Sequence, residues 1–233
     1  MRSPISCLPA NNRPNLGIDK PAGDVYNFDA NKHSWESAAN QDRAIHSVIY
    51  DHEKKTLRVL DQLLLPHDTV FIEILSVDDA FNIIKKMQVR GAPLIATVGT
   101  LGLGIELDKK GPKNYGELLK FIDDCCEKLI ASRPTAINLR NAILNIQKII
   151  DNDRNESPNN ALRLIERIQN AAFQWFLNEK SENDLLLKNA TICVESNYGN
   201  DEMLTVMTVC NTGSLATSSH GTALGVIRQL HFR

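Results

Sequence analysis

Residues 91–105 form an uncharged stretch of 15 residues that contains four glycines, and this stretch sets the strongest limit on the fold. A helix that crosses a membrane needs about 18–20 apolar residues, so the stretch instead predicts a buried helix inside a folded domain. Each glycine in a helix costs about 1 kcal/mol relative to alanine. We expect the close approach of a neighbouring helix or of a ligand to compensate that cost.

The composition of the 233-residue chain is that of an ordinary globular protein, with 42% hydrophobic and 23% charged residues. These values exclude a chain that is disordered throughout. The formal net charge of -2 lacks the basic excess that is typical of proteins that bind nucleic acid or a membrane surface. We therefore expect neither as a partner.

The cysteines number five and show no pairing rhythm, which indicates free thiols in a reducing compartment. Adjacent Cys125 and Cys126 lack the C-x-x-C spacing of a metal or redox site, and we expect them in the core. No histidine pair has ligand spacing with a carboxylate, so we predict no metal. No apolar segment of a secretory signal follows the first residues. We expect a cytoplasmic location, with the nucleus as an alternative.

Apolar periodicity predicts a β-hairpin followed by helices. Two short apolar runs at 47–50 and 57–60 flank a polar turn, as in a hairpin. Helical spacing then predicts five helices, which cover residues 77–89, 94–107, 115–130, 136–150 and 161–179. In the last forty residues, a β-branched run at 204–209 and a helix at 221–230 flank a small-residue turn. This order is typical of the opening of an α/β domain.

We therefore predict an α+β N-terminal domain, a hairpin plus a helical bundle, followed by the first βα unit of a truncated Rossmann-like α/β domain. The expected parts are a flexible N-terminal extension at 1–45, the mainly helical domain at 46–180, a linker at 181–203 and the α/β start at 204–233.

Two arginines that precede prolines are candidate phosphate ligands. Arg90 offers planar donors, Gly91 lets the backbone approach a ligand, and the helix after Pro93 directs free N–H groups toward an anion. Arg133 stands before another proline and helix, so the two arginines can clamp one phosphate. Taken singly, each motif is better explained as an ordinary helix start with a solvated arginine.

The turn from Cys210 to Ser214 is the strongest candidate site. Cys210 falls at the carboxyl end of the predicted strand, where open α/β sheets bind ligands, and just before a helix N-terminus that favours a thiolate. The glycines that follow are spaced too widely for G-x-G-x-x-G, which argues against a dinucleotide. The alternatives are an inert buried cysteine at 210 and, for the nearby His220, a helix cap rather than a base.

Four groups of residues in one order carry a more specific signal than any single motif. They are Leu57–Pro66, Val89–Pro93, Arg133–Asn138, and Cys210–Thr217 with Gly221–Arg228. Together, from about residue 45 onward, they resemble the methylthioribose-1-phosphate isomerase family, which is related to the regulatory subunits of translation initiation factor 2B.

The resemblance implies interconversion of 5-methylthioribose 1-phosphate and 5-methylthioribulose 1-phosphate in methionine salvage, without a cofactor. It implies a homodimer that binds a small phosphosugar. By position in the motifs, Arg90, Gly91, Ala92 and Arg133 are substrate-binding residues. The resemblance also implies that Cys210 is the catalytic residue, which stabilises the reacting centre.

Several residues depart from the family pattern. The acid of the family is an aspartate in a Gly-Ala-Asp-Arg segment, which does not occur in these 233 residues. Val209 stands where a histidine usually precedes the cysteine. We therefore expect a truncated isomerase with a phosphate half-site that is inactive alone. A non-catalytic regulatory or interaction module is the alternative, and a redox sensor centred on Cys210 is a third.

Overall fold

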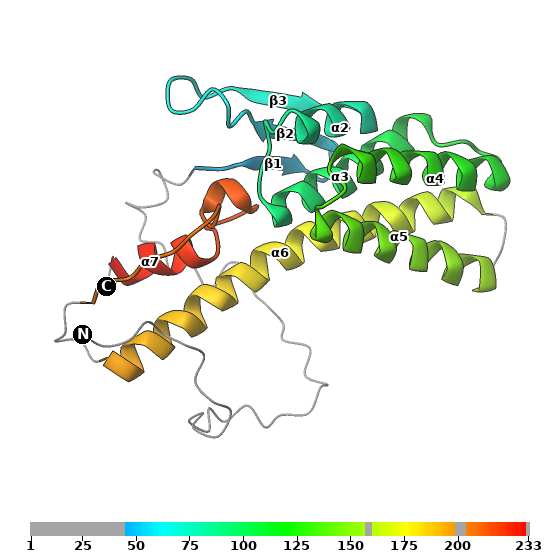
Figure 1. Ribbon diagram of the computed structural model, residues 1–233. Helices are drawn as coiled ribbons and strands as arrows, with labels where there is room; N and C mark the ends of the chain where they lie inside the picture. Colours follow the sequence, from blue (N-terminus) through cyan, green and yellow to red (C-terminus); the bar gives the residue numbers. More distant parts are fainter. Residues whose placement is uncertain (1–44, 157–159, 199–203, 232–233) are drawn as a thin grey trace. The chain divides into compact units, whose positions relative to one another are not determined.

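The computed structural model describes residues 45–156, 160–198 and 204–231. The extension predicted at 1–45 therefore falls outside the described residues, apart from Ile45. The described part of the chain combines a small antiparallel sheet with helices, as Figure 1 shows. This mixed architecture confirms the predicted combination of strands and a helical bundle.

The sheet has three antiparallel strands in the order β1-β2-β3. The hairpin of β1 (Val48–Asp51) and β2 (Thr56–Leu60) confirms the prediction. A third strand, β3 (Phe71–Ile74), pairs with β2 and was not predicted. Its four residues lack the length that makes alternation visible in a sequence. Alternate β2 residues Leu57 and Val59 are fully buried, so one face of the sheet covers the helices.

The five predicted helices are present with shifted ends. They are α2 (Val77–Lys85), α3 (Ala92–Lys110), α4 (Tyr115–Ser132), α5 (Ile137–Glu156) and α6 (Ala161–Tyr198). The uncharged stretch lies in α3, whose residues 94–107 are all buried, so α3 is the central helix. No helix in the described part of the chain has the length and apolar character needed to cross a membrane.

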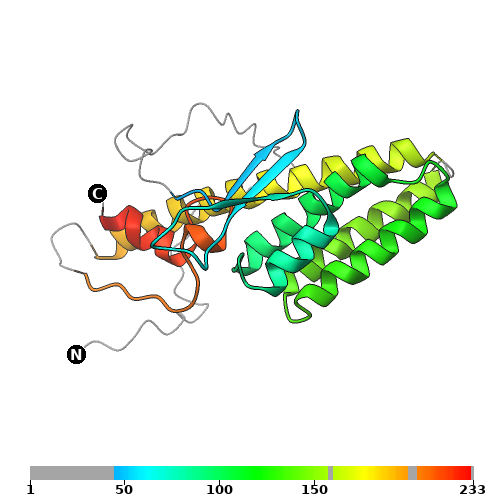
Figure 2. The same cartoon turned by 90° about the horizontal axis from the view of Figure 1, so that it is seen from above.

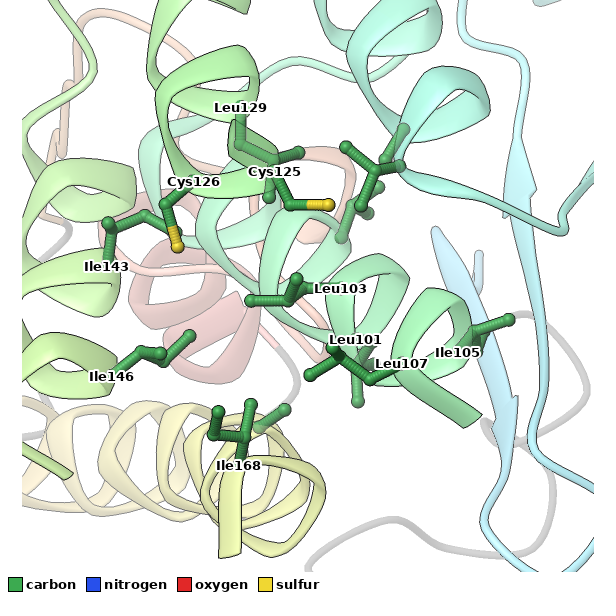
Figure 3. Close-up of a cluster of buried hydrophobic side chains, with 14 of the residues drawn as sticks. Leu101, Leu103, Ile105, Leu107, Cys125, Cys126, Leu129, Ile143, Ile146 and Ile168 are labelled. Carbon is green, nitrogen blue, oxygen red and sulfur yellow. The ribbon is translucent and has the colours of Figure 1, made fainter. Parts of the chain in front are cut away.

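Glycines let the neighbours of α3 pack closely. A Cβ at Gly99 would lie 2.7 Å from Leu139 of α5, and one at Gly102 would lie 3.0 Å from Ala80 of α2. These contacts confirm that neighbouring helices explain the glycines. The surrounding core, which includes Cys125 and Cys126 as expected, is drawn in Figure 3.

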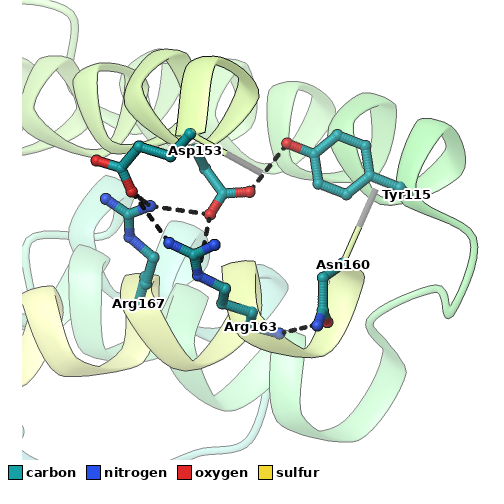
Figure 4. Close-up of polar contacts among 6 residues, drawn as sticks. Tyr115, Asp153, Asn160, Arg163 and Arg167 are labelled. Carbon is teal, nitrogen blue, oxygen red and sulfur yellow. Dashed lines mark hydrogen bonds and ion pairs between the residues drawn. The ribbon is translucent and has the colours of Figure 1, made fainter. Parts of the chain in front are cut away.

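A buried carboxylate ties three helices together at one end of the bundle. Asp153 of α5 is fully buried and accepts hydrogen bonds from Tyr115 of α4 (3.1 Å) and Arg167 of α6 (2.9 Å), as Figure 4 shows. Arg167 also bonds Glu156 at 3.1 Å. The pairing satisfies a charge that burial would otherwise make costly.

The linker predicted at 181–203 is wrong over residues 181–198, because α6 continues to Tyr198. Residues Asn183, Leu187 and Thr191 are buried at a spacing of four, which keeps one face of the helix covered. Figure 2 shows α7 (Ala223–His231) beside this second half of α6. The polar composition after residue 179 concealed the short buried stripe.

The strand predicted at 204–209 is wrong. These residues have no regular secondary structure and are mostly exposed, with Met207 92% and Val209 85% accessible. A β-branched run needs a neighbouring strand for its backbone hydrogen bonds, and no strand pairs with it in the described part of the chain. The helix of the expected βα unit is present as α7, preceded by the 3-10 helix η2 (Ser214–Ala216).

Candidate functional site

The start of α3 meets η2 in direct contact. Gly91, the N-cap of α3, has φ of 100°, and a Cβ there would lie 2.3 Å from the Cα of Ala216. Both the left-handed backbone and the lack of space require glycine. The structure thus brings the Arg90–Pro93 turn onto the segment that follows Cys210.

Side chains from the sheet region fix the same segment. Gln62, just after β2, donates from Nε2 to the carbonyl oxygen of Leu215 (2.7 Å) and from its backbone N–H to Gln88 (2.9 Å). The hydroxyl of Ser47 donates to the carbonyl of Thr217. The Leu57–Pro66 motif had suggested no role for Gln62. Gln62 is buried, and the sequence carries no signal of that burial because Gln62 follows the charged Asp61.

The turn between Cys210 and α7 is closed by its own backbone. Gly213 and Gly221 form an isolated antiparallel bridge, and the N–H of Thr222 donates to the carbonyl of Thr212 (2.8 Å). The Thr212 hydroxyl accepts from the N–H of Leu224 at 3.2 Å, which caps α7. This bond occupies one of the helix amides that we expected to favour a Cys210 thiolate.

Cys210 is exposed and has φ of 77°. The expectation that it ends a strand is wrong because the strand is absent, and its exposure also contradicts the alternative of an inert buried residue. Cys125 and Cys126 are the inert thiols: burial raises their pKa values to about 11 and about 12. Cys210 therefore remains a candidate through its accessibility.

Arg90 carries an unused donor beside the Gly91 turn. Its Nε is buried and has no hydrogen-bond partner among the described residues. Among the residues that the structure describes, no side chain caps the N-terminus of α3, which begins at Ala92. An unpaired guanidinium nitrogen next to an uncapped helix N-terminus is suited to an anion such as phosphate.

Arg133 is the C-cap of α4, in the connection to α5. Its backbone N–H donates to Ile130 (3.3 Å), and its carbonyl accepts from Ala136 (2.9 Å). Within residues 45–156, 160–198 and 204–231, no hydrogen bond or ion pair joins Arg133 to the Arg90 turn. The two-arginine clamp stays a prediction.

A buried polar cluster on α6 was not predicted. The carboxylate of Glu179 accepts from the backbone N–H of Ser218 (2.9 Å) and from the side-chain amide of Asn183. Burial raises the pKa of Glu179. Its hydrophilic sequence context resembles that of any exposed helix face, so only the three-dimensional structure reveals this cluster.

A cavity of about 240 Å³ lies elsewhere, between the β1–β2 hairpin, α3 and α6. Its lining includes Tyr50, His52, Lys55 and Gln169, and none of the predicted site residues. Lys55 is already paired with Asp108 and Gln169. We therefore place the candidate site at the Gly91–Ala216 contact, where the chain's motifs meet.

Comparisons with known proteins identify the family of the chain. Residues 88–233 match the initiation factor 2 subunit family. A methylthioribose-1-phosphate isomerase from Caenorhabditis briggsae is 44% identical over 193 residues, which cover 83% of this chain and 50% of the relative. The corresponding protein from Yarrowia lipolytica is 37% identical, covering 81% of this chain and 51% of the relative.

Two solved structures share the fold. A 5-methylthioribose 1-phosphate isomerase from Pyrococcus horikoshii has a TM-score of 0.67 and 28% identity, covering 80% of this chain and 49% of that protein. The delta subunit of translation initiation factor eIF-2B from A. fulgidus has a TM-score of 0.61 and 26% identity, covering 81% and 51%. The chain spans about half the length of the relatives it matches.

Proposed function

Since the chain belongs to the initiation factor 2 subunit family, we propose that it functions as a methylthioribose-1-phosphate isomerase, to which these residues contribute a substrate-binding half-site. The observation that carries the proposal is the contact between Gly91 and Ala216, which unites two of the matching motifs at an uncapped helix N-terminus. The names of the relatives at 36–44% identity support the isomerase over the initiation factor.

The phosphate of the substrate binds at the start of α3 in this proposal. Arg90 supplies the unpaired Nε, and the adjacent backbone of Gly91 and Ala92 forms the start of α3, to which no side-chain cap is bonded among the described residues. Arg133 supplies a second guanidinium from the α4–α5 connection. Each charged hydrogen bond of this kind stabilises a complex by about 1.5–3 kcal/mol.

The chemistry needs an acid as well as a binding site. Opening the furanose ring requires a proton on the ring oxygen, after which the C2 hydrogen moves to C1 and the C2 hydroxyl gives up its proton as C2 becomes the carbonyl of the ketose. Cys210 is exposed and stands where the resemblance implies stabilisation of the reacting centre. The 233 residues contain no Gly-Ala-Asp-Arg segment to supply the acid. We infer that a polypeptide of these residues alone binds the phosphosugar without isomerising it.

Calorimetric titration of the 233-residue polypeptide with 5-methylthioribose 1-phosphate tests the proposal. Arg90→Ala and Arg133→Ala are each expected to weaken affinity about 10- to 100-fold, the effect of one charged hydrogen bond. Arg140→Ala is the matched control, since Arg140 is an exposed arginine of α5. Equal affinities in all four proteins would contradict the assignment of Arg90 and Arg133 to the phosphate half-site. Isomerisation by the wild-type polypeptide would contradict the inference that these residues alone lack the catalytic acid.

A regulatory or interaction module is the second candidate, favoured by the likeness to the initiation factor subunit. It predicts stable association with a protein partner and no affinity for the phosphosugar. We further propose a homodimer in the cytoplasm or nucleus. Sedimentation equilibrium of the purified polypeptide distinguishes a dimer from a monomer.

A further inference from the structure

The contact between Gly91 and Ala216 depends on how the segment around Ala216 is held. Uncharged groups hold it from the sheet side, through Gln62 and Ser47. On the side of α6, a carboxylate holds it: Glu179, 9% exposed, accepts the backbone N–H of Ser218. Ser218 lies two residues after Ala216, which is about 7 Å of extended chain.

Ser218 is fixed from α3 as well. Its hydroxyl lies 3.4 Å from the hydroxyl of Thr97, which is fully buried in the second turn of α3. The same helix begins at the Gly91 turn. Glu179 of α6 and Thr97 of α3 therefore hold Ser218 from two sides. The N-terminus of α3 is also the place where the proposed phosphate binds.

The carboxylate form of Glu179 matches its two donors. One oxygen accepts from Ser218 and the other from the amide of Asn183. A neutral glutamine presents one oxygen and one NH₂ group, so one of the two donors would face another donor. A buried donor left without an acceptor costs more than the hydrogen bond contributes when it is made.

We propose that Glu179 is a positioning residue for phosphosugar binding: by accepting the Ser218 N–H, it holds Ala216 against Gly91 and thereby sets the geometry of the anion site at the start of α3. This inference rests on the proposed function. Glu179 does not touch the ligand. Its effect passes through residues 216–218 to the Arg90–Gly91 turn.

The test compares Glu179→Gln and Glu179→Ala with wild type in the 233-residue polypeptide. Glu182→Gln is the matched control, because Glu182 is an exposed glutamate of the same helix. Amide hydrogen exchange at Ser218 reports the hydrogen bond directly, without any ligand. Calorimetry with 5-methylthioribose 1-phosphate reports the effect on the site.

We expect Glu179→Ala to speed exchange at Ser218 and to weaken affinity, each by about tenfold, with partial rescue by Glu179→Gln and no change in Glu182→Gln. Exchange within α3 should stay at the wild-type rate in all variants. If Glu179→Ala does not fold, Glu179→Gln alone decides, with about a threefold effect expected.

The outcomes separate this inference from the proposed function. If wild type and both Glu179 variants bind the phosphosugar with equal affinity, the positioning role is overturned and the proposed function is left intact. Wild type that does not bind overturns the proposed function and the positioning role with it. Faster exchange at Ser218 without weaker binding also overturns the positioning role.

Discussion

The helical bundle around α3 and the segment 204–231 are held by different forces. In the bundle, buried apolar side chains surround a central helix whose residues 94–107 are all buried. In the second region, the loop before α7 is held chiefly by hydrogen bonds to Gln62, Ser47 and Glu179. Apolar packing restrains a whole helix through many contacts at once, whereas each hydrogen bond restrains a single residue at a set distance. The proposed site lies where the rigid bundle meets the hydrogen-bonded segment.

The largest expected effect is on the bundle. Leu103→Ala removes a fully buried side chain from α3 and should lower the free energy of unfolding by about 2–5 kcal/mol. Urea denaturation followed by circular dichroism measures the loss. The exposed Leu162→Ala in α6 is the control and should change stability by less than about 0.5 kcal/mol. Similar losses in both variants would contradict a core centred on α3.

Gly91→Ala should act on the contact between the two regions. A Cβ there overlaps Ala216, and the φ of 100° is strained for alanine, at a cost of about 1–3 kcal/mol. We expect faster hydrogen exchange over residues 213–221 and weaker binding of the phosphosugar. Gly116→Ala, whose Cβ would come no nearer than 3.4 Å to a neighbouring atom, should leave both unchanged. Wild-type rates of hydrogen exchange over residues 213–221 in Gly91→Ala would show that the Gly91–Ala216 contact does not hold this segment in place.

His220 should make the stability of the protein sensitive to acid. The pKa of His220 is lowered from 6.5 to about 4, chiefly by burial and further by the charges of Arg228, Lys180 and His46. The carboxylate of Asp184, 3.9 Å from Nε2 of His220, does not offset the effect of burial. Between these pH values the unfolded chain binds a proton that the folded chain does not. Stability is therefore expected to fall as pH falls from 6.5 toward 4.

His220→Gln should flatten this pH dependence, as measured by denaturant unfolding at several pH values. The exposed His67→Gln is the control. A slope that is the same in wild type and His220→Gln would show that other groups determine the acid response.

The smallest effect is expected at Met207. This side chain is 92% exposed in the irregular segment 204–209, so Met207→Ser should change the free energy of unfolding by less than about 0.5 kcal/mol. Thermal denaturation checks it. A loss above 1 kcal/mol would indicate that this run is packed in solution, which would blur the contrast between the two regions.

Patterns of periodicity predicted α2, α4, α5 and α6 well, because each of these helices buries one face and repeats it in the sequence. The fully buried α3 was indicated instead by its uncharged length. The glycines of the central helix also indicated its close neighbours correctly. The strand at 204–209 was predicted wrongly because β-branched composition reports local preference, whereas a strand exists only where another strand pairs with it. The end of α6 was misplaced for a similar reason: a stripe of one buried residue in four is hard to see among charged ones.

The site was predictable in part. Of the motif residues Arg90, Gly91 and Ala92, Gly91 contacts Ala216 in the segment after Cys210, although no sequence spacing indicates that contact. Gln62 and Glu179 were missed because each is a polar residue whose burial follows only from tertiary packing. The roles of Arg133 and Cys210 in binding and catalysis remain predictions.

The contact of Gly91 with Ala216 also bears on how the chain folds. It joins positions that differ by 125 residues (216 − 91), whereas the helices of the bundle form mainly from nearby residues. Closing so long a loop carries a larger entropic cost than forming a helical turn. We expect the bundle to assemble first and the Gly91–Ala216 contact to form late, so ligand-binding competence should lag behind the gain of helical signal during refolding.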